Sequence, residues 1–201
     1  GESMSRFWSA PTALLVLLAL ATTTPRAHAE PTTSVDFVMG DGVTLRTDIY
    51  TSGTEPQPVI LIRTPYHRSS VEPVALEIMA AYDATVFVQD VRGRGDSQGV
   101  DSVFRDDALD GRESLDWIEF LGWSNGVVAS WGSSALAITQ MLMAPDATPL
   151  YQCQYTSVGT HAIADQVAYR GGVRRRDVDV SLTDQDATSI IGQWDAHPDP
   201  E

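Results

Sequence analysis

The fold is decided by residues 123–140, which read Trp-Ser-Asn-Gly-Val-Val-Ala-Ser-Trp-Gly-Ser-Ser-Ala-Leu-Ala-Ile-Thr-Gln. A turn at Ser124–Gly126 leads into the apolar run Val127–Trp131, which is typical of a buried strand. Residues 132–134, Gly-Ser-Ser, follow, and a helix-forming stretch comes next. A strand, a tight turn with a central serine and a helix, in that order, predict a nucleophile elbow that exposes the Ser134 hydroxyl above a sheet.

The Gly-x-Ser triplet alone leaves two interpretations open, a catalytic serine and a strand-to-helix turn without catalysis. A serine hydroxyl is a poor nucleophile at neutral pH and needs a base, usually a histidine that an acid orients. In α/β-hydrolases both groups follow the serine in the sequence. Only His161 and His197 follow Ser134, and we expect structural roles for both, while His67 precedes the serine. We therefore assign no base.

Strands and helices alternate along the chain up to about residue 160. Residues 34–39 and 43–50 alternate apolar and polar side chains around a Gly-Asp-Gly turn, which predicts an opening β-hairpin. The further predicted elements are strands at 58–62, 85–88, 127–131 and 150–155, and helices at 71–82, 108–120 and 135–143. This order predicts an α/β fold, and with the elbow an α/β-hydrolase fold, with a mostly parallel sheet and flanking helices.

Residues 1–29 are predicted to be a secretory signal peptide. Met4–Arg6 supplies a basic start, residues 13–21 form an apolar core, and Ala27–Ala29 fits a cleavage site after Ala29. The apolar run is too short to span a bilayer, so we expect a secreted or periplasmic protein without membrane association after cleavage. Gly1–Ser3 resembles an upstream extension or a tag.

Residues 30–160 are predicted to be the N-terminal part of a catalytic domain, and residues 161–201 the start of a helical cap. In the second region glycines, arginines and prolines separate short helical pieces, of which residues 181–194 form the longest. An α/β-hydrolase core usually needs well over about 200 residues, so we expect the fold to be incomplete in this chain and the cap to be truncated.

The charge and the cysteine usage narrow the possible partners. The 201 residues carry 13 basic and 27 acidic side chains, a formal net charge of −14, and such a surface repels phosphate backbones. Nucleic acid is therefore not an expected partner. Cys153 is the single cysteine, which excludes an intrachain disulfide, and its apolar surroundings predict a small buried side chain.

A tyrosine follows the first apolar strand directly, within Arg63-Thr64-Pro65-Tyr66. Loops at the carboxyl ends of central strands bind ligands in α/β sheets. A hydroxyl at that position can donate to a developing oxyanion, which makes Tyr66 a candidate for an oxyanion hole. The alternative is a surface tyrosine beside an arginine that pairs with an acid.

Residues 90–99, Asp-Val-Arg-Gly-Arg-Gly-Asp-Ser-Gln-Gly, follow the second apolar strand. Their glycine spacing is one residue too long for a dinucleotide fingerprint, and no helix begins inside them, so we reject a nucleotide site. The tripeptide Arg94-Gly95-Asp96 also matches an adhesion motif by chance. We expect a structural turn, in which Arg92 and Arg94 pair with carboxylates and the glycines adopt positive φ.

Taken together, these motifs resemble the X-Pro dipeptidyl-peptidase and cocaine-esterase-like (CocE/NonD) serine hydrolases, a group that includes α-amino-acid ester hydrolases and glutaryl acylases. The matching stretches are residues 41–45, 63–66, 90–99, 110–111, 116–118, 123–126 and 132–134. Their order and spacing are specific and cover residues 34 to about 176. Residues 169–172 and 197–198 also resemble the helical cap of that family.

The resemblance implies roles for three residues. Ser134 matches the nucleophile, Tyr66 matches the tyrosine that completes the oxyanion hole, and Ala135 occupies the position whose backbone N–H supplies the other donor. The family usually has tyrosine at position 135 and glycine at 129 and 137, so the chain resembles a divergent member of it. The acid and base of the family would lie beyond residue 201. No metal or organic cofactor is implied.

The sequence therefore predicts a secreted serine hydrolase that cleaves an ester or amide, with acyl esters, X-Pro dipeptidyl substrates or amino-acid esters as candidate substrates. This chain alone is expected to be inactive because it lacks the base. Two alternatives stay open. One is another α/β-hydrolase, a carboxylesterase or lipase. The other is a non-catalytic remnant or binding module that kept the fold.

Overall fold

The structure is a computed structural model, and it describes residues 31–171 and 173–177 of the 201-residue chain. The predicted signal peptide (1–29), the predicted helix at 181–194 and His197 lie outside the described residues.

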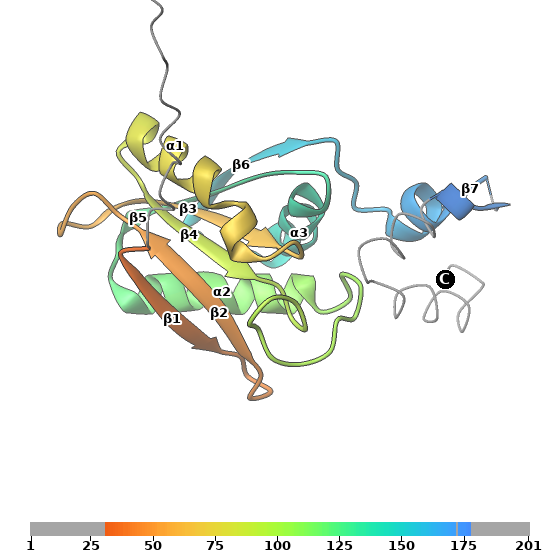
Figure 1. Ribbon diagram of the computed structural model, residues 1–201, viewed down its shortest axis with the longest axis horizontal. Helices are drawn as coiled ribbons and strands as arrows, with labels where there is room; N and C mark the ends of the chain where they lie inside the picture. The colour runs from red at the N-terminus through yellow and green to blue at the C-terminus, as the bar shows by residue number, and fades with distance from the viewer. Residues whose placement is uncertain (1–30, 172, 178–201) are drawn as a thin grey trace, which may run out of the picture.

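Six strands form one mixed sheet that three helices flank (Figure 1). The strands are β1 (Thr33–Val38), β2 (Thr44–Tyr50), β3 (Gln57–Thr64), β4 (Thr85–Asp90), β5 (Ser124–Ser133) and β6 (Tyr151–Ser157). The helices are α1 (Glu72–Tyr82), α2 (Asp107–Leu121) and α3 (Ala135–Met143), with short 3-10 turns η1 (Arg68–Ser70) and η2 (Ala144–Asp146). Each element that the sequence pattern predicted up to residue 157 is present.

The strand order is β1-β2-β4-β3-β5-β6. Strands β1 and β2 pair antiparallel, and β2 pairs antiparallel with β4, whereas β4, β3, β5 and β6 run parallel to one another. Leu61 of β3 lies opposite Phe87 of β4 on one side and Ser130 of β5 on the other. The mostly parallel sheet confirms the predicted α/β-hydrolase fold class, and it brings the carboxyl ends of β3, β4 and β5 to one edge.

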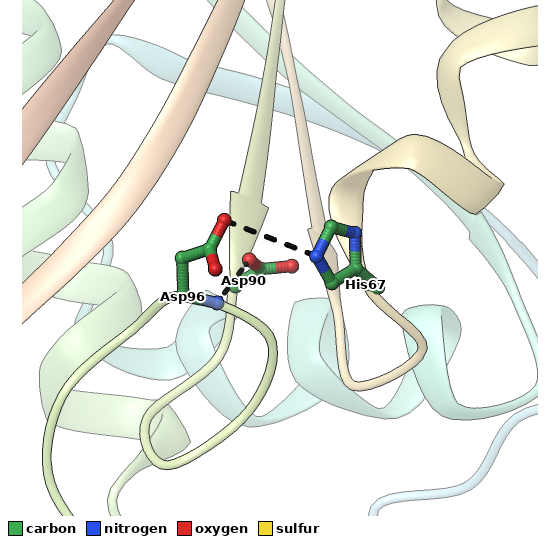
Figure 2. A group of neighbouring side chains, drawn as sticks. All are labelled: His67, Asp90 and Asp96. Atoms are coloured by element: carbon green, nitrogen blue, oxygen red, sulfur yellow. Dashed lines mark hydrogen bonds and ion pairs between the residues drawn. The ribbon is translucent and has the colours of Figure 1, made fainter.

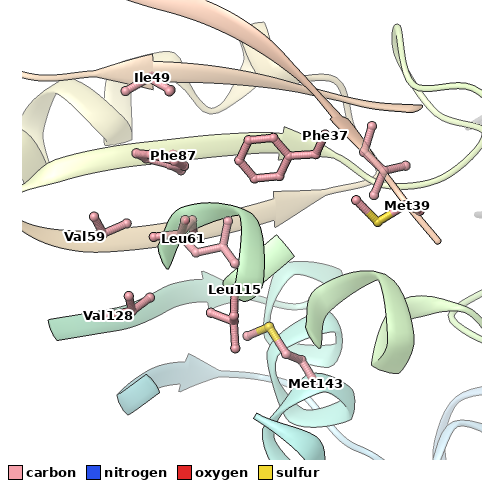
Figure 3. Close-up of a cluster of buried hydrophobic side chains, with 11 residues drawn as sticks. Phe37, Met39, Ile49, Val59, Leu61, Phe87, Leu115, Val128 and Met143 are labelled. Carbon is pink, nitrogen blue, oxygen red and sulfur yellow. The ribbon is translucent and has the colours of Figure 1, made fainter. Parts of the chain in front are cut away.

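Side chains of β3 and β4 alternate between two separate cores, because successive residues of a strand point to opposite faces. Val59, Leu61 and Phe87 join Leu115 and other residues beneath α2 (Figure 3). On the opposite face, Ile62, Val86 and Val88 pack with buried residues of α1. Strands buried on both faces read as continuous apolar runs, which is why the pattern identified them.

Helices α2 and α3 pack closely on the same side of the sheet. A Cβ atom at Gly111 of α2 would lie 2.8 Å from the Cβ and Cγ atoms of Met143 in α3, so only glycine fits at this contact. Met143 is itself 1% exposed and belongs to the core beneath α2. This packing fixes the axis of α3, and therefore the direction in which its amino end meets the sheet.

The structure differs from the predictions at three places. Strand β5 begins at Ser124, so the predicted turn at 124–126 is part of the strand. Cys153 is exposed rather than buried, because β6 is an edge strand with side chains 152–155 in solvent. After β6 come a π-helical turn, η3 (Ile163–Ala168), and a two-residue hairpin, β7 (Tyr169–Arg170) and β8 (Val173–Arg174).

Within residues 31–171 and 173–177, none of the helices combines the length and the apolar character that a membrane crossing requires.

Candidate active site

Ser134 lies between the end of β5 at Ser133 and the start of α3 at Ala135. Its backbone has φ 57° and ψ −125°, a conformation that a residue with a Cβ adopts only at a cost of about 1–3 kcal/mol. The Ser134 N–H donates to the Ser157 carbonyl at 2.9 Å, which ties the turn to the end of β6. The side chain is exposed, as a nucleophile elbow requires.

Two glycines make the tight elbow possible. A Cβ atom at Gly132 would lie 2.5 Å from the Leu136 Cβ and 2.7 Å from the Leu136 backbone, so a larger residue would push α3 away from β5. A Cβ atom at Gly159 would lie 2.5 Å from the Ala137 Cβ. Ala137 stands where the resembling family usually has glycine, and the missing side chain at 159 leaves room for its methyl group.

Ala135 begins α3, and its backbone N–H belongs to the first helical turn. The first four amides of a helix have no acceptor within the helix, so they are available to a ligand. Two later amides of this turn are already bound: the Ala137 and Ile138 N–H groups donate to the Ser134 carbonyl at 2.9 and 3.1 Å. The partial positive charge of the helix amino end also favours an anion here.

Tyr66 follows β3, the neighbour of β5 in the sheet. The backbone N–H of Tyr66 donates to the Thr64 hydroxyl at 3.0 Å, and its side chain is 43% exposed. Because β3 and β5 run parallel and end at Thr64 and Ser133, the Tyr66 loop and the Ser134 elbow leave the same edge of the sheet. The fold therefore places both predicted site residues at one edge.

The loop after Tyr66 carries a buried arginine that the sequence analysis did not single out. The Arg68 guanidinium pairs with Asp48 and Asp96, each at 2.9 Å, and with the fully buried Asp90. Burial lowers the pKa of Arg68, but the hydrogen bonds to Asp96 and Asp48 outweigh it and raise that pKa above its usual value. Arg68 therefore remains charged at the centre of three carboxylates.

His67, Asp90 and Asp96 also gather in this place, in an arrangement that metal ions use elsewhere (Figure 2). His67 Nε2 lies 3.9 Å from the Asp96 carboxylate, and its Nδ1 lies 2.9 Å from the Ser69 hydroxyl. Arg68 already neutralises both carboxylates, so a cation would have to displace the guanidinium. The donor set fits a structural ion-pair cluster better than a metal site.

The turn at 91–99 has the structural role that was predicted for it. Arg92 bonds the buried Asp110 through two nitrogens at 3.0 and 2.6 Å, and Arg94 pairs with Asp101 at 2.5 Å. The Asp110 hydrogen bond, despite opposing burial, raises the pKa of Arg92 above its usual value. The glycines at positions 93, 95 and 99 all have positive φ, between 54° and 89°.

Comparison with known proteins agrees with this geometry. The family model of the X-Pro dipeptidyl-peptidases (S15 family) matches residues 41–199. The chain belongs to this family. Within it, the chain is 36% identical over 109 residues to the cocaine esterase of Rhodococcus sp. (strain MB1 Bresler), an alignment that covers 51% of this chain and 19% of the esterase.

Solved structures show the same fold. An α-amino acid ester hydrolase superposes with a TM-score of 0.66 at 22% identity, covering 88% of this chain and 33% of the other. A CocE/NonD family hydrolase from Staphylococcus aureus gives a TM-score of 0.65 at 20% identity, with 82% and 35% covered. The chain thus spans about a third of these structures and a fifth of the esterase.

The described residues place no histidine in hydrogen-bond contact with Ser134, the predicted nucleophile. Within residues 31–171 and 173–177, the hydrogen bonds of Ser134 are made by its backbone N–H and carbonyl. His161 lies exposed in the loop after β6, and His67 contacts Ser69 in its own turn. The structure leaves the prediction that the acid and base lie beyond residue 201 untested.

Sequence reasoning missed the ion pairs beneath the site. Arg63 is 2% exposed, donates to the Gln89 side chain at 2.9 Å and pairs with Asp107 at 2.8 Å. Asp90 ends a run of apolar residues, so its burial could have been inferred from its position at the end of β4. Its partner Arg68 lies 22 residues away, and no local pattern indicates that pairing.

Proposed function

We propose that the protein is a serine hydrolase that cleaves an ester or amide by acyl transfer through Ser134. The observation that carries the proposal is the backbone of Ser134, held at φ 57° between a strand and a helix. A turn with this backbone conformation could be made by glycine at residue 134 without strain. A nucleophilic role for the exposed hydroxyl would explain why a serine occupies this strained position.

In this mechanism the Ser134 Oγ attacks the carbonyl carbon of the substrate, and its proton passes to a base. The carbonyl oxygen becomes an oxyanion, to which the Tyr66 O–H and the Ala135 N–H donate. Collapse of the intermediate expels the alcohol or amine, which takes up the proton, and leaves an acyl group on Ser134. Water then repeats the steps and releases the acid.

We place the base and the acid that orients it in a longer form of the polypeptide, beyond residue 201. The partial coverage of the related proteins supports this placement. The 201-residue chain should then not turn over p-nitrophenyl acetate faster than its Ser134→Ala variant. Turnover by this chain that depends on Ser134 would contradict the placement.

The substrate class follows from the family and from the relatives' names. Acyl esters, amino-acid esters and X-Pro dipeptidyl amides all present a carbonyl to the same nucleophile. The predicted signal peptide adds that the enzyme acts outside the cytoplasm, as a secreted or periplasmic protein. Amino-terminal sequencing of the exported protein should find Glu30 as the first residue. An exported protein that still carries Met4 would refute this part of the proposal.

The test uses the longest natural form of the protein and a fluorophosphonate probe, which reacts with activated serines. We expect labelling that Ser134→Ala abolishes. Ser133→Ala is the matched control, because Ser133 is the neighbouring serine at the end of β5. Labelling that survives Ser134→Ala, or that Ser133→Ala removes, would sink the assignment of the nucleophile.

Tyr66→Phe tests the oxyanion hole and separates this proposal from a carboxylesterase or lipase that uses a glycine-rich loop. Removing one donor typically lowers kcat by about 10²–10³-fold, and KM should change little because the donor acts in the transition state. An unchanged kcat in Tyr66→Phe would favour the other type of hydrolase. A protein that the probe does not label at all would favour a non-catalytic module.

A further inference from the structure

Asp90 occupies the centre of the polar cluster beside Tyr66. It is the last residue of β4 and is fully buried. Its Oδ1 accepts the backbone N–H of Arg68 at 2.7 Å, and its Oδ2 accepts the backbone N–H of Asp96 at 3.0 Å and pairs with the Arg68 guanidinium. Burial raises the pKa of Asp90, against the Asp96 amide and the Arg68 charge, which act in the opposite direction.

The loop that this carboxylate holds is strained at one residue. His67, between Tyr66 and Arg68, has φ 79° and ψ 136°, which residues with a Cβ rarely adopt. Such a conformation persists only where the surroundings hold it on both sides. Before His67, the Tyr66 amide is bound to the Thr64 hydroxyl, and after it, the Arg68 amide is bound to Asp90. The His67 carbonyl and imidazole also accept hydrogen bonds from Ser70 and Ser69, so the carboxylate is one of several anchors that fix this loop.

The same carboxylate connects the loop to the glycine-rich turn at 91–99, for which the proposed mechanism has no use. A Cβ atom at Gly95 would lie 2.1 Å from the Asp90 Oδ2, so the turn packs directly against the carboxyl group. The Ser97 hydroxyl donates to the Asp90 carbonyl at 2.7 Å. Figure 2 shows Asp90 at the end of its strand, between His67 on one side and Asp96 on the other. The turn at 91–99 thus packs against Asp90 and limits the movement of its carboxylate.

We propose that Asp90 is a positioning residue for the oxyanion hole: through the Arg68 amide and the strained His67, it holds the Tyr66 hydroxyl where the oxyanion forms. This inference rests on the proposed function. Asp90 itself touches no substrate in this scheme. Because a displacement of about 1 Å at a reacting group can cost about 10²-fold in rate, a loop anchored in this way protects kcat rather than substrate binding.

A double-mutant cycle in the longest natural form of the enzyme tests the proposal, with kcat and KM measured on a p-nitrophenyl ester. We expect Asp90→Asn to lower kcat by about 10–100-fold and to change KM by less than about threefold. In the Tyr66→Phe background the same substitution should lower kcat by less than about threefold, because the hydroxyl that it positions is already gone.

Two further variants separate positioning from general stability. Asp48→Asn is the matched control, because Asp48 pairs with the same guanidinium but has no contact with the loop amide. It should lower the thermal midpoint and leave kcat within about threefold. If Asp90→Asn does not fold, Asp90→Glu replaces it, since the longer side chain displaces the carboxylate without removing its charge. The same non-additivity with Tyr66→Phe is then expected.

The inference is overturned if Asp90→Asn leaves kcat unchanged, or if it lowers kcat by the same factor with and without the Tyr66 hydroxyl. It is also overturned if Asp48→Asn reproduces the loss in kcat. Failure of the proposed function would be visible separately, as absent labelling of Ser134 or an unchanged kcat in Tyr66→Phe. If kcat is unchanged in Tyr66→Phe, the Tyr66 hydroxyl has no catalytic role, and the positioning role of Asp90 is overturned as well.

Discussion

A single residue, Ser134, carries a conflict between stability and chemistry. Its φ of 57° costs about 1–3 kcal/mol for any residue with a Cβ, and the Gly132 and Gly159 contacts hold the turn in that shape. Evolution could remove the strain with a glycine, but a glycine has no nucleophile. The proposed role of the Ser134 hydroxyl as a nucleophile explains why the strain is retained, which is the stability–activity conflict expected at active sites.

This conflict predicts that Ser134→Gly is more stable than Ser134→Ala. Both variants lack the hydroxyl, but only alanine keeps the strained Cβ. Glycine gains about 1–3 kcal/mol from strain relief and loses about 0.5–1 kcal/mol to the entropy of the unfolded chain, so the difference should be about 1 kcal/mol. Urea unfolding of the two variants measures it. Equal stability, or a more stable alanine variant, would show that the backbone is not strained.

At the residue scale, the sequence predicted Ser134 and Tyr66 but not the groups that hold them. Both site residues follow apolar strands, so hydrophobic patterning locates them. The anchor between Arg68 and Asp90 joins residues 22 positions apart, one in the turn η1 and the other at the end of β4. The positive φ of His67 could not be predicted from the sequence, because no glycine stands there to mark it.

Between elements, the contact of α3 with the segment after β6 decides how the elbow closes. Gly159 follows β6 by two residues, and a Cβ there would lie 2.5 Å from the Ala137 Cβ, a distance that requires movement. Ala137 is fully buried, so it has no free direction in which to move. The contact between residues 137 and 159 therefore has room for the methyl group of Ala137 but not for a second one at Gly159.

We expect Gly159→Ala to lower the free energy of unfolding by about 1–3 kcal/mol through overpacking. Ala137→Gly alone should lower it by about 1 kcal/mol because glycine disfavours a helix. Combined, the two changes should cost less than their sum, since Ala137→Gly removes the methyl group with which the new methyl group at residue 159 would clash. Chemical denaturation of the four proteins gives the coupling, and strict additivity would contradict the close contact.

Elements are the scale at which prediction from sequence succeeded best. Strands β3 and β4 are buried on both faces, and helix α3 runs over the predicted residues 135–143, because its apolar start follows directly from the elbow. The predictions were weaker after β6, where η3 and the β7–β8 hairpin replace the expected helical pieces. Two-residue strands bury too little apolar surface to produce a periodic pattern.

For the whole molecule, the order of the sheet decides which strand meets solvent. The strand order places β3 and β4 at the centre and leaves β6 at one edge of the described sheet. Apolar patterning predicted β6 correctly as a strand but could not give its place in the sheet, since that depends on pairing between distant segments. The prediction that Cys153 is buried was wrong for this reason.

The edge position makes Cys153 a reporter of the sheet's arrangement. In the native 201-residue chain, the exposed thiol on β6 should react with Ellman's reagent in a stoichiometry of about one per chain, without denaturant, because access limits such reactions. Cys153→Ser supplies the blank, as no other cysteine exists. A thiol that reacts only after guanidinium is added would mean that β6 is covered in solution, by another part of the polypeptide or by a second copy of it. Comparing reaction rates at low and high protein concentration then separates these two, because only association between copies depends on concentration.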